Sequence, residues 1–174
     1  MKKLFLYVFL VLMFCNVGFA ENCPDDMKLE GLGHDHTVKS YAEYHGNYYV
    51  PEEAYKFGLE IQEAVKNKDL DKLLSLIKDD LISGPKMSFF DNKTYDEAFP
   101  VTFRGAVLMN KPECTPVGSD RGFILGNGQI WYDKIKQNLY ENGKGNISKM
   151  TKEMKDWEVY AGLSVKNTKK KTIN

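Results

Sequence analysis

The sequence predicts an α+β fold in which N-terminal helices pack on a curved antiparallel sheet. Three observations support this fold class. Two amphipathic helical patterns follow one another between residues 51 and 77, two strand patterns flank the glycine-rich segment 126–128, and a third alternating pattern covers residues 157–165. Helices first and antiparallel strands last are typical of domains whose helices are segregated on one side of a sheet.

The first helix is expected to begin at Pro51 and to end near Lys66. Proline presets the backbone for the first helical position, and the glutamates that follow it suit the positive end of the helix dipole. Asp69 can cap a second helix, and Ser83-Gly84-Pro85 is expected to end this helical hairpin. The second helix owes its apolar face to Leu70, Leu73, Leu74 and Ile77.

Two shorter segments follow. Residues 94–99 carry a brief helical signal, whereas the apolar run from Val101 to Met109 fits neither the helical nor the strand period cleanly. We favour a helix for residues 101–109 and leave the strand alternative open. The segment 141–148 is predicted to be a polar loop.

The strand predictions centre on a hairpin. Residues 121–125 and 129–133 flank Gly126-Asn127-Gly128, and Asn-Gly tolerates the positive φ that a tight hairpin requires. Phe123 and Trp131 are assigned to the core. From Trp157 to Val165, apolar residues alternate with more polar ones, which indicates a third strand with one buried face.

The sequence divides into four parts. Residues 1–20 combine Lys2 and Lys3 with an apolar run and a small-residue site ending at Ala20, as in a secretory signal peptide. Residues 21–50 are predicted to be irregular, residues 51–165 to form a single domain, and residues 166–174 to be a basic, solvated tail. The expected location is therefore the periplasm or the external medium.

Charge and hydropathy exclude two classes of partner. The chain has 24 Lys and Arg against 24 Asp and Glu, so the excess of positive charge on which nucleic-acid binding depends is missing. After residues 1–20 no apolar run approaches the roughly 20 residues of a spanning helix. A small molecule or a partner protein is the expected partner.

Cysteine usage predicts one disulfide. Removal of the signal would also remove Cys15, which leaves Cys23 and Cys114 as a pair in an oxidising compartment. A bond between them would close a long loop and stabilise the fold by on the order of 4 kcal/mol. Two free thiols are the alternative, and the spacing excludes a redox or zinc CxxC motif.

Residues 51–165, above all the segment from Arg121 to Asp133 (RGFILGNGQIWYD), resemble small secreted bacterial proteins of the nuclear-transport-factor-2-like superfamily. The resemblance implies a cone in which a curved sheet wraps helices and leaves a pocket. Because that superfamily includes isomerases, hydrolases and pure binding domains, it does not select a chemistry. The catalytic carboxylates and tyrosine of its ketosteroid-isomerase branch have no counterparts here.

Five polar residues are candidates for such a pocket. They are the chain's two arginines and their polar neighbours near the hairpin: Arg104, Asp120, Arg121, Tyr132 and Asp133. Arginine in a lysine-rich chain suggests a bidentate or stacked contact. Asp120 or Asp133 could act as a general acid or base if burial raised its pKa. Structural ion pairs and strand-end hydrogen bonds are the alternative interpretation.

The three histidines lie close together in the sequence. His34, His36 and His45 could bind zinc or copper through imidazole nitrogens, with Asp35 or Glu43 adding oxygen. Solvated loop histidines are the alternative. The nearby tyrosines could stack on a flat ligand or cover the domain's edge, and they are Tyr41, Tyr44, Tyr48 and Tyr49.

These features lead to a functional hypothesis. We expect an exported, non-catalytic domain that binds a small ligand or a protein through the cone pocket or the sheet face, without a cofactor. The nucleophile elbow, the phosphate loop and the metalloprotease helix are all missing from the sequence. The alternatives are an acid–base enzyme of the same fold and a metal-binding protein that uses the histidines.

Overall fold

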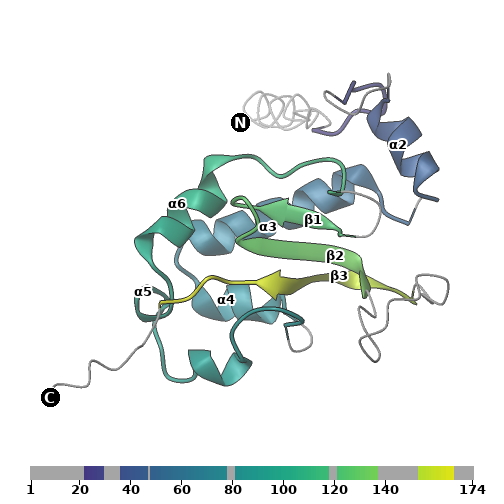
Figure 1. The fold of residues 1–174 in the computed structure, drawn as a ribbon. Coiled ribbons are helices and arrows are strands. Elements are labelled where there is room, and N and C mark those ends of the chain that lie inside the picture. Colours follow the sequence, from purple (N-terminus) through teal and green to yellow (C-terminus); the bar gives the residue numbers. More distant parts are fainter. Residues whose placement is uncertain are drawn as a thin grey trace, which may run out of the picture.

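The computed structural model describes residues 22–29, 36–46, 48–77, 81–117, 121–136 and 153–166. This part of the chain contains five α-helices and one three-stranded antiparallel sheet, which confirms the α+β class (Figure 1). The sheet is open, with strand order β1-β2-β3. The finer prediction, a nuclear-transport-factor-2-like cone, is not tested by these elements and remains a prediction.

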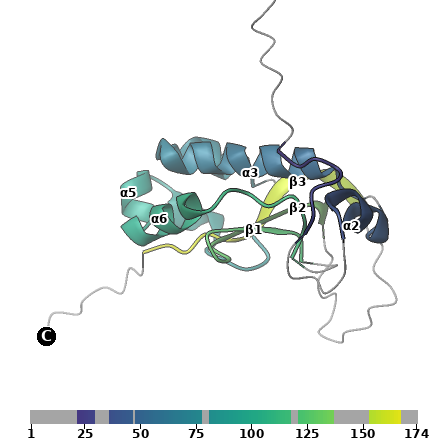
Figure 2. The same ribbon diagram turned by 90° about the horizontal axis from the view of Figure 1, so that it is seen from above.

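Helix α3, Pro51–Lys66, covers one face of the sheet (Figure 2). It begins and ends where the sequence predicts, with proline at the first position and Glu52 and Glu53 in the first turn. Its buried side faces the strands because the apolar residues recur at helical spacing. That side consists of Ala54, Tyr55, Gly58, Ile61, Ala64 and Val65.

Helix α4, Leu70–Ser75, begins at the predicted cap, where the Asp69 side chain accepts a hydrogen bond of 2.9 Å from the Lys72 amide. The chain leaves the helix earlier than predicted, because segment 82–83 pairs with a strand instead. The Ile82 amide donates to the Tyr160 carbonyl at 2.8 Å, and the Gly162 amide donates to the Ser83 carbonyl at 2.7 Å. These bonds occupy part of the outer edge of β3.

Three short helical elements gather at one end of the sheet (Figure 1). They are the 3-10 helix η1, Met87–Phe90, and the helices α5, Tyr95–Ala98, and α6, Val101–Met109. A capping box between Thr94 and Glu97 starts α5. Residues 101–109, whose state the sequence left open, are helical.

The three strands are β1, Phe123–Leu125, β2, Ile130–Lys136, and β3, Glu153–Gly162. Phe123 lies opposite Tyr132, which confirms the predicted hairpin. Gly126, Asn127 and Gly128 all have positive φ, as the turn prediction requires. Register shifts between Trp131 and Tyr132 and between Asp133 and Ile135 mark irregularities in the pairing of β2 with β3.

Strand β3 begins before the predicted Trp157 and ends before the predicted Val165. Gly162 and Leu163 have φ values of 102° and 62°, so the backbone leaves the extended region there. The strand begins earlier than predicted because it pairs with β2 from Glu153 onward, where Glu153 lies opposite Lys136. The alternation of apolar and polar residues shows which side chains are buried. The ends of a strand depend instead on the backbone that it pairs with and on residues with positive φ.

The main core lies between the sheet and α3. Phe123, Ile130, Tyr132 and Val159 are almost fully buried on the face toward the helix. Trp131 is only half-buried because it alternates with Ile130 and Tyr132 and therefore points to the other face. The assignment of Phe123 to the core is confirmed, and that of Trp131 is wrong.

The N-terminal region is more regular than predicted. Helix α2, Val38–Tyr44, lies within the segment expected to be irregular, and a capping box between Thr37 and Ser40 starts it. Such a short capped helix has only Val38 and Ala42 on its buried side, too few for a visible period. We call described residues 22–29 and 36–46 the arm, and described residues 48–166 the body.

Several predictions lie outside the described residues. They are the signal peptide 1–20, His34, Asp120, the polar loop 141–148 and the greater part of the basic tail 166–174. The described part contains no helix long and apolar enough to cross a bilayer.

Candidate functional site

Arg104 stabilises the end of a helix. Its Nη2 donates a hydrogen bond of 3.0 Å to the carbonyl oxygen of Lys66, the last residue of α3. A cation at this position satisfies one of the unpaired carbonyl groups at the negative end of the helix. This contact explains an arginine at position 104 without a ligand.

Arg121 is exposed, and among the described residues its backbone rather than its guanidinium group forms a hydrogen bond. The Arg121 carbonyl oxygen accepts a hydrogen bond from the Tyr160 hydroxyl. This hydrogen bond connects strand β3 with the residues that precede β1. Arg121 and Arg104 line neither of the two depressions described below.

Asp133 and Glu158 face each other across β2 and β3, and they are 2% and 5% exposed. The Lys134 amide donates to Asp133 Oδ1 at 2.7 Å. Burial, and then the negative charge of Asp133, raise the pKa of Tyr48. Two buried carboxyl side chains therefore occupy opposite positions on neighbouring strands.

Tyr132 is fully buried beneath α3. In the described structure its hydroxyl has no hydrogen-bond partner, and burial, followed by the charge of Glu113, raises its pKa. Gly58 makes room for it, because a Cβ atom at Gly58 would lie 2.6 Å from both the Tyr132 hydroxyl oxygen and Pro112 Cβ. Tyr132 is therefore a packing residue.

His36 and His45 belong to one aromatic cluster on α2. The ring of His45 lies 4.5 Å from that of Tyr41 and 5.1 Å from that of Tyr44, and His36 lies 6.2 Å from Tyr41. In the described residues no group of three or more His, Cys, Asp or Glu side chains is placed to hold a metal ion. The metal hypothesis therefore depends on His34, outside the described residues.

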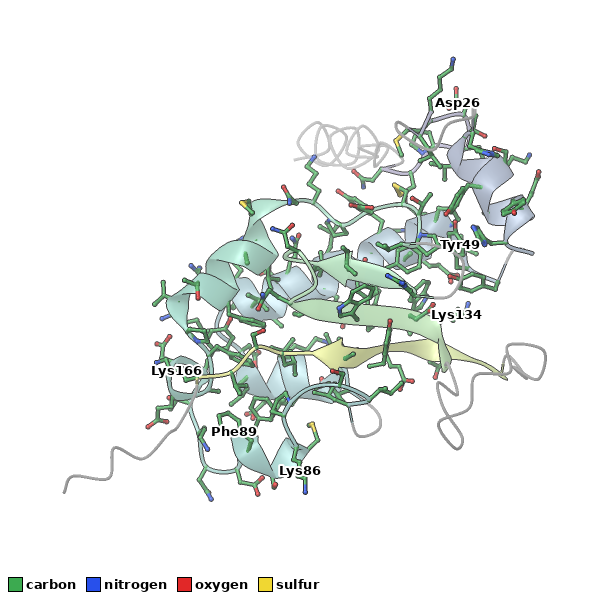
Figure 3. All side chains as sticks on the ribbon, in the orientation of Figure 1. Asp26, Tyr49, Lys86, Phe89, Lys134 and Lys166 are labelled. Carbon is green, nitrogen blue, oxygen red and sulfur yellow. A yellow bond between two sulfur atoms is a disulfide. The ribbon has the colours of Figure 1, made fainter. Side chains whose placement is uncertain are left out.

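The tyrosines of this region divide into two groups. Tyr48 and Tyr49 are buried in the core, where their rings pack edge to face at 4.9 Å. Tyr49 and Lys134 lie at the α2 end of the sheet, whereas Lys86 lies beyond the β3 edge (Figure 3). Tyr44 is 77% exposed, and Tyr41 is half-buried. Of the four, only Tyr41 reaches the groove described next.

Cys23 and Cys114 form the predicted disulfide, with their Cα atoms 5.6 Å apart. The bond joins the arm to the loop that follows α6. Both sulfur-bearing residues are buried, and they pack with Val38 of α2 and Tyr55 of α3 in a second apolar cluster. The disulfide therefore fixes the arm against the body.

A groove lies where the arm, α3 and the loop after α6 meet, and we call it the disulfide groove. Its volume is about 560 Å³, within the range of small-molecule sites. Apolar side chains and backbone form most of its walls. The lining residues are Asn22, Met27, Leu29, Tyr41, Tyr55, Lys111, Pro112, Glu113, Cys114, Thr115, Pro116 and Val117.

The 111–117 loop forms one wall of the disulfide groove. Pro112 is buried against α3, whereas Lys111 and Glu113 on either side of it are exposed. Within the described chain, residues 111–116 form no backbone–backbone hydrogen bond. This wall can therefore offer amide and carbonyl groups, as well as two opposite charges, to a bound molecule.

A second depression lies on the outer surface of α3 and α6 and has a volume of about 520 Å³. Long side chains such as Lys56, Glu60 and Lys66 line it. Because such side chains lose much rotamer freedom on ordering, this surface is less suited to hold a ligand than the disulfide groove.

The structure does not gather the predicted pocket residues. Arg104, Arg121, Tyr132 and Asp133 line neither the disulfide groove nor the depression on α3 and α6. Sequence reasoning singled out Tyr41 and Cys114 of the disulfide groove but missed Lys111 and its neighbours. The available signal was the segment Lys-Pro-Glu-Cys-Thr-Pro around Cys114, where two prolines limit the backbone next to a disulfide.

Comparison with known proteins gives no relative. No protein-family model, no curated protein and no solved structure matches this chain. The resemblance to the nuclear-transport-factor-2-like superfamily therefore remains a prediction, and function is argued from the geometry of the described residues.

Proposed function

We propose that the mature chain is an exported binding protein that takes a small ligand in the disulfide groove. The observation that carries the proposal is the position of the groove beside the Cys23–Cys114 bond, with walls from the arm, α3 and the 111–117 loop. A covalent tie between two walls reduces the ordering that a ligand must impose, so less binding free energy is lost.

The groove also has the chemical character of a ligand site. Apolar side chains such as Met27, Leu29 and Val117 provide surface for an apolar ligand to bury. The Tyr41 hydroxyl and the Thr115 hydroxyl are polar groups that can fix its orientation. This combination of apolar walls with a few polar groups is typical of small-molecule sites.

Native mass spectrometry of the mature protein from its own host tests the proposal. We expect a bound mass that is lost on denaturation and lost in Thr115→Trp, whose larger side chain fills the groove. Val101→Trp is the matched control, because Val101 is 88% exposed and is absent from the groove lining. A bare mass for the wild type, with no ligand shift in a screen of small molecules, would reject the proposal.

A second candidate is an acid–base enzyme that uses Asp133. The burial of Asp133 beside Glu158 and the influence of its charge on Tyr48 favour this alternative. Buried carboxylates can take the protonation state that proton transfer requires. The test is deuterium exchange from solvent into carbonyl compounds with acidic α-protons. Catalysed exchange that Asp133→Asn abolishes supports the enzyme, and exchange at the buffer rate contradicts it.

A further inference from the structure

We propose that the disulfide groove takes a short apolar peptide with free termini, whose carboxylate pairs with Lys111 and whose ammonium pairs with Glu113. This inference rests on the proposed function and names its ligand class. The evidence is the charge pattern of the groove wall, the spacing of the two charges, and the unpaired backbone between them.

The groove carries one charge of each sign. Lys111 and Glu113 are its charged lining residues, and the other ten are neutral. In the described part of the structure neither side chain forms an ion pair. A ligand with a single charge would meet one partner and one repulsive neighbour, whereas a ligand with both charges would meet two partners.

The spacing of the charges fits a peptide of two or three residues. Lys111 and Glu113 flank the buried Pro112, and this alternation of exposure is typical of an extended chain whose residues i and i+2 point to the same side. Two residues of extended chain span about 7 Å. The termini of a dipeptide are separated by about the same length, so each terminus can reach its partner.

The middle of the groove suits the rest of a peptide. The backbone of residues 111–116 makes no backbone–backbone hydrogen bond within the described chain, so its carbonyls and its non-proline amides lack backbone partners there and can pair with a peptide group. Met27, Leu29, Tyr55 and Val117 provide apolar contact for the side chains of the ligand. Leucine and phenylalanine side chains therefore suit the site better than charged ones.

Isothermal titration calorimetry with four related peptides tests the inference. The probes are Leu-Leu, its N-acetyl form, its C-terminal amide, and the peptide with both blocks. We expect Leu-Leu to bind about tenfold more tightly than either singly blocked peptide, because each block removes one charge-assisted contact. A doubly blocked peptide that binds as tightly as Leu-Leu would overturn the inference.

Two variants assign each terminus to its partner. Lys111→Gln is expected to abolish the preference for Leu-Leu over its amide, and Glu113→Gln to abolish the preference over the N-acetyl form. Lys86→Gln is the matched control, since Lys86 is exposed, lies beyond the β3 edge of the sheet (Figure 3) and does not line the groove. Preferences that persist in both variants place the charges elsewhere and overturn the assignment.

Failure of this inference can be told apart from failure of the proposed function. If none of the four peptides binds while the wild type retains a ligand that Thr115→Trp loses, the groove is a ligand site and the peptide assignment is wrong. If no peptide binds and no ligand is retained, the proposed function fails as well.

Discussion

The arm and the body are held together by different forces. In the body, a large apolar cluster joins α3, α6 and the three strands, and residues such as Ile61, Phe103 and Tyr132 are almost fully buried. The arm contributes Ala42 to that cluster, and otherwise rests on a small cluster of Cys23, Val38, Tyr55 and Cys114. Burial stabilises the body, whereas one covalent bond secures the arm.

This difference places the candidate site at the boundary between the two regions. The disulfide groove takes one wall from the arm and the others from α3 and the loop after α6. Sites are often formed by less stable segments that a rigid scaffold positions. The arm has the smaller apolar cluster of the two regions, so we expect its attachment to decide whether the groove exists.

The largest expected loss of stability comes from removing the disulfide that attaches the arm to the body. Replacing Cys23 and Cys114 together by Ser removes a crosslink with a sequence separation of 91. In the chain-entropy account the free energy of unfolding falls by on the order of 4 kcal/mol. Chemical denaturation measures this loss. Limited proteolysis should cut the arm first while the body persists, and an arm that stays protected would contradict the comparison.

The body should respond most strongly to added volume. Gly58→Ala places a methyl group 2.6 Å from the Tyr132 hydroxyl oxygen and Pro112 Cβ, and we expect a loss of about 1–3 kcal/mol from overpacking. Tyr132→Phe in the same chain should recover part of it, because the phenol oxygen is removed. Gly105→Ala in α6 is the control, since nothing lies within 4 Å there.

In urea denaturation, Gly58→Ala should lower the free energy of unfolding and Gly105→Ala should raise it. Gly105→Ala gains helix propensity, about 0.5–1 kcal/mol in favour of the folded state. If Gly58→Ala costs no more than Gly105→Ala, the close packing of α3 on the sheet is not a determinant of the body's stability.

Loss of a helix cap should affect global stability in the body but only local stability in the arm. Thr37 caps α2 in the arm, with a bond of 3.2 Å from the Ser40 amide to its hydroxyl, and Asp69 caps α4 in the body. Loss of either cap costs about 1 kcal/mol locally. Asp69→Ala should lower the free energy of global unfolding by about this amount, whereas Thr37→Ala should chiefly speed amide exchange in α2.

Hydrogen exchange resolves the two effects, because it reports local opening and global unfolding separately. Equal loss of global stability in Thr37→Ala and Asp69→Ala would show that the arm unfolds together with the body.

The fold could be predicted largely from periodicity and caps. Pro51 and Asp69 mark helix starts that the structure confirms, and the glycines around Asn127 mark the hairpin. The helix α2 leaves no visible period in the sequence, because its buried side consists of only two residues. The end of β3 could not be predicted, because left-handed residues and the pairing of Ser83 set it.

The candidate site was much harder to predict. The two arginines and the polar residues of the hairpin are the natural candidates for the pocket of a cone, but Arg104 bonds the end of α3 and Tyr132 packs under Gly58. The groove instead depends on which distant segments the disulfide joins, and a sequence gives the pairing of Cys23 and Cys114 without the surface around it. The prolines around Cys114 mark a restrained loop, but the sequence does not show that Lys111 and Glu113 line a groove.

The smallest expected effects come from removing exposed hydrogen bonds and ion pairs in the two regions. In the body, Glu53 of α3 accepts hydrogen bonds from Lys134 of β2 at 3.1 Å and from Trp157 of β3 at 3.4 Å. In the arm, Lys39 and Asp25 lie 3.9 Å apart, and both are well exposed. Glu53→Gln should cost less than about 1 kcal/mol, and Asp25→Asn should cost nothing measurable.

The interaction between Glu53 and Lys134 in the body should also depend on pH. The hydrogen bond from Lys134 lowers the pKa of Glu53 in the folded state, against the smaller effect of burial. Its stabilisation is therefore complete above the pKa of the unfolded chain, about 4.3, and is lost as the pH falls through the lower folded-state value. The difference in unfolding free energy between wild type and Glu53→Gln should be constant from pH 7 to pH ~5 and shrink below pH ~4. A difference that is unchanged at pH ~3 would show that Glu53 joins α3 to the sheet through shape and not through charge.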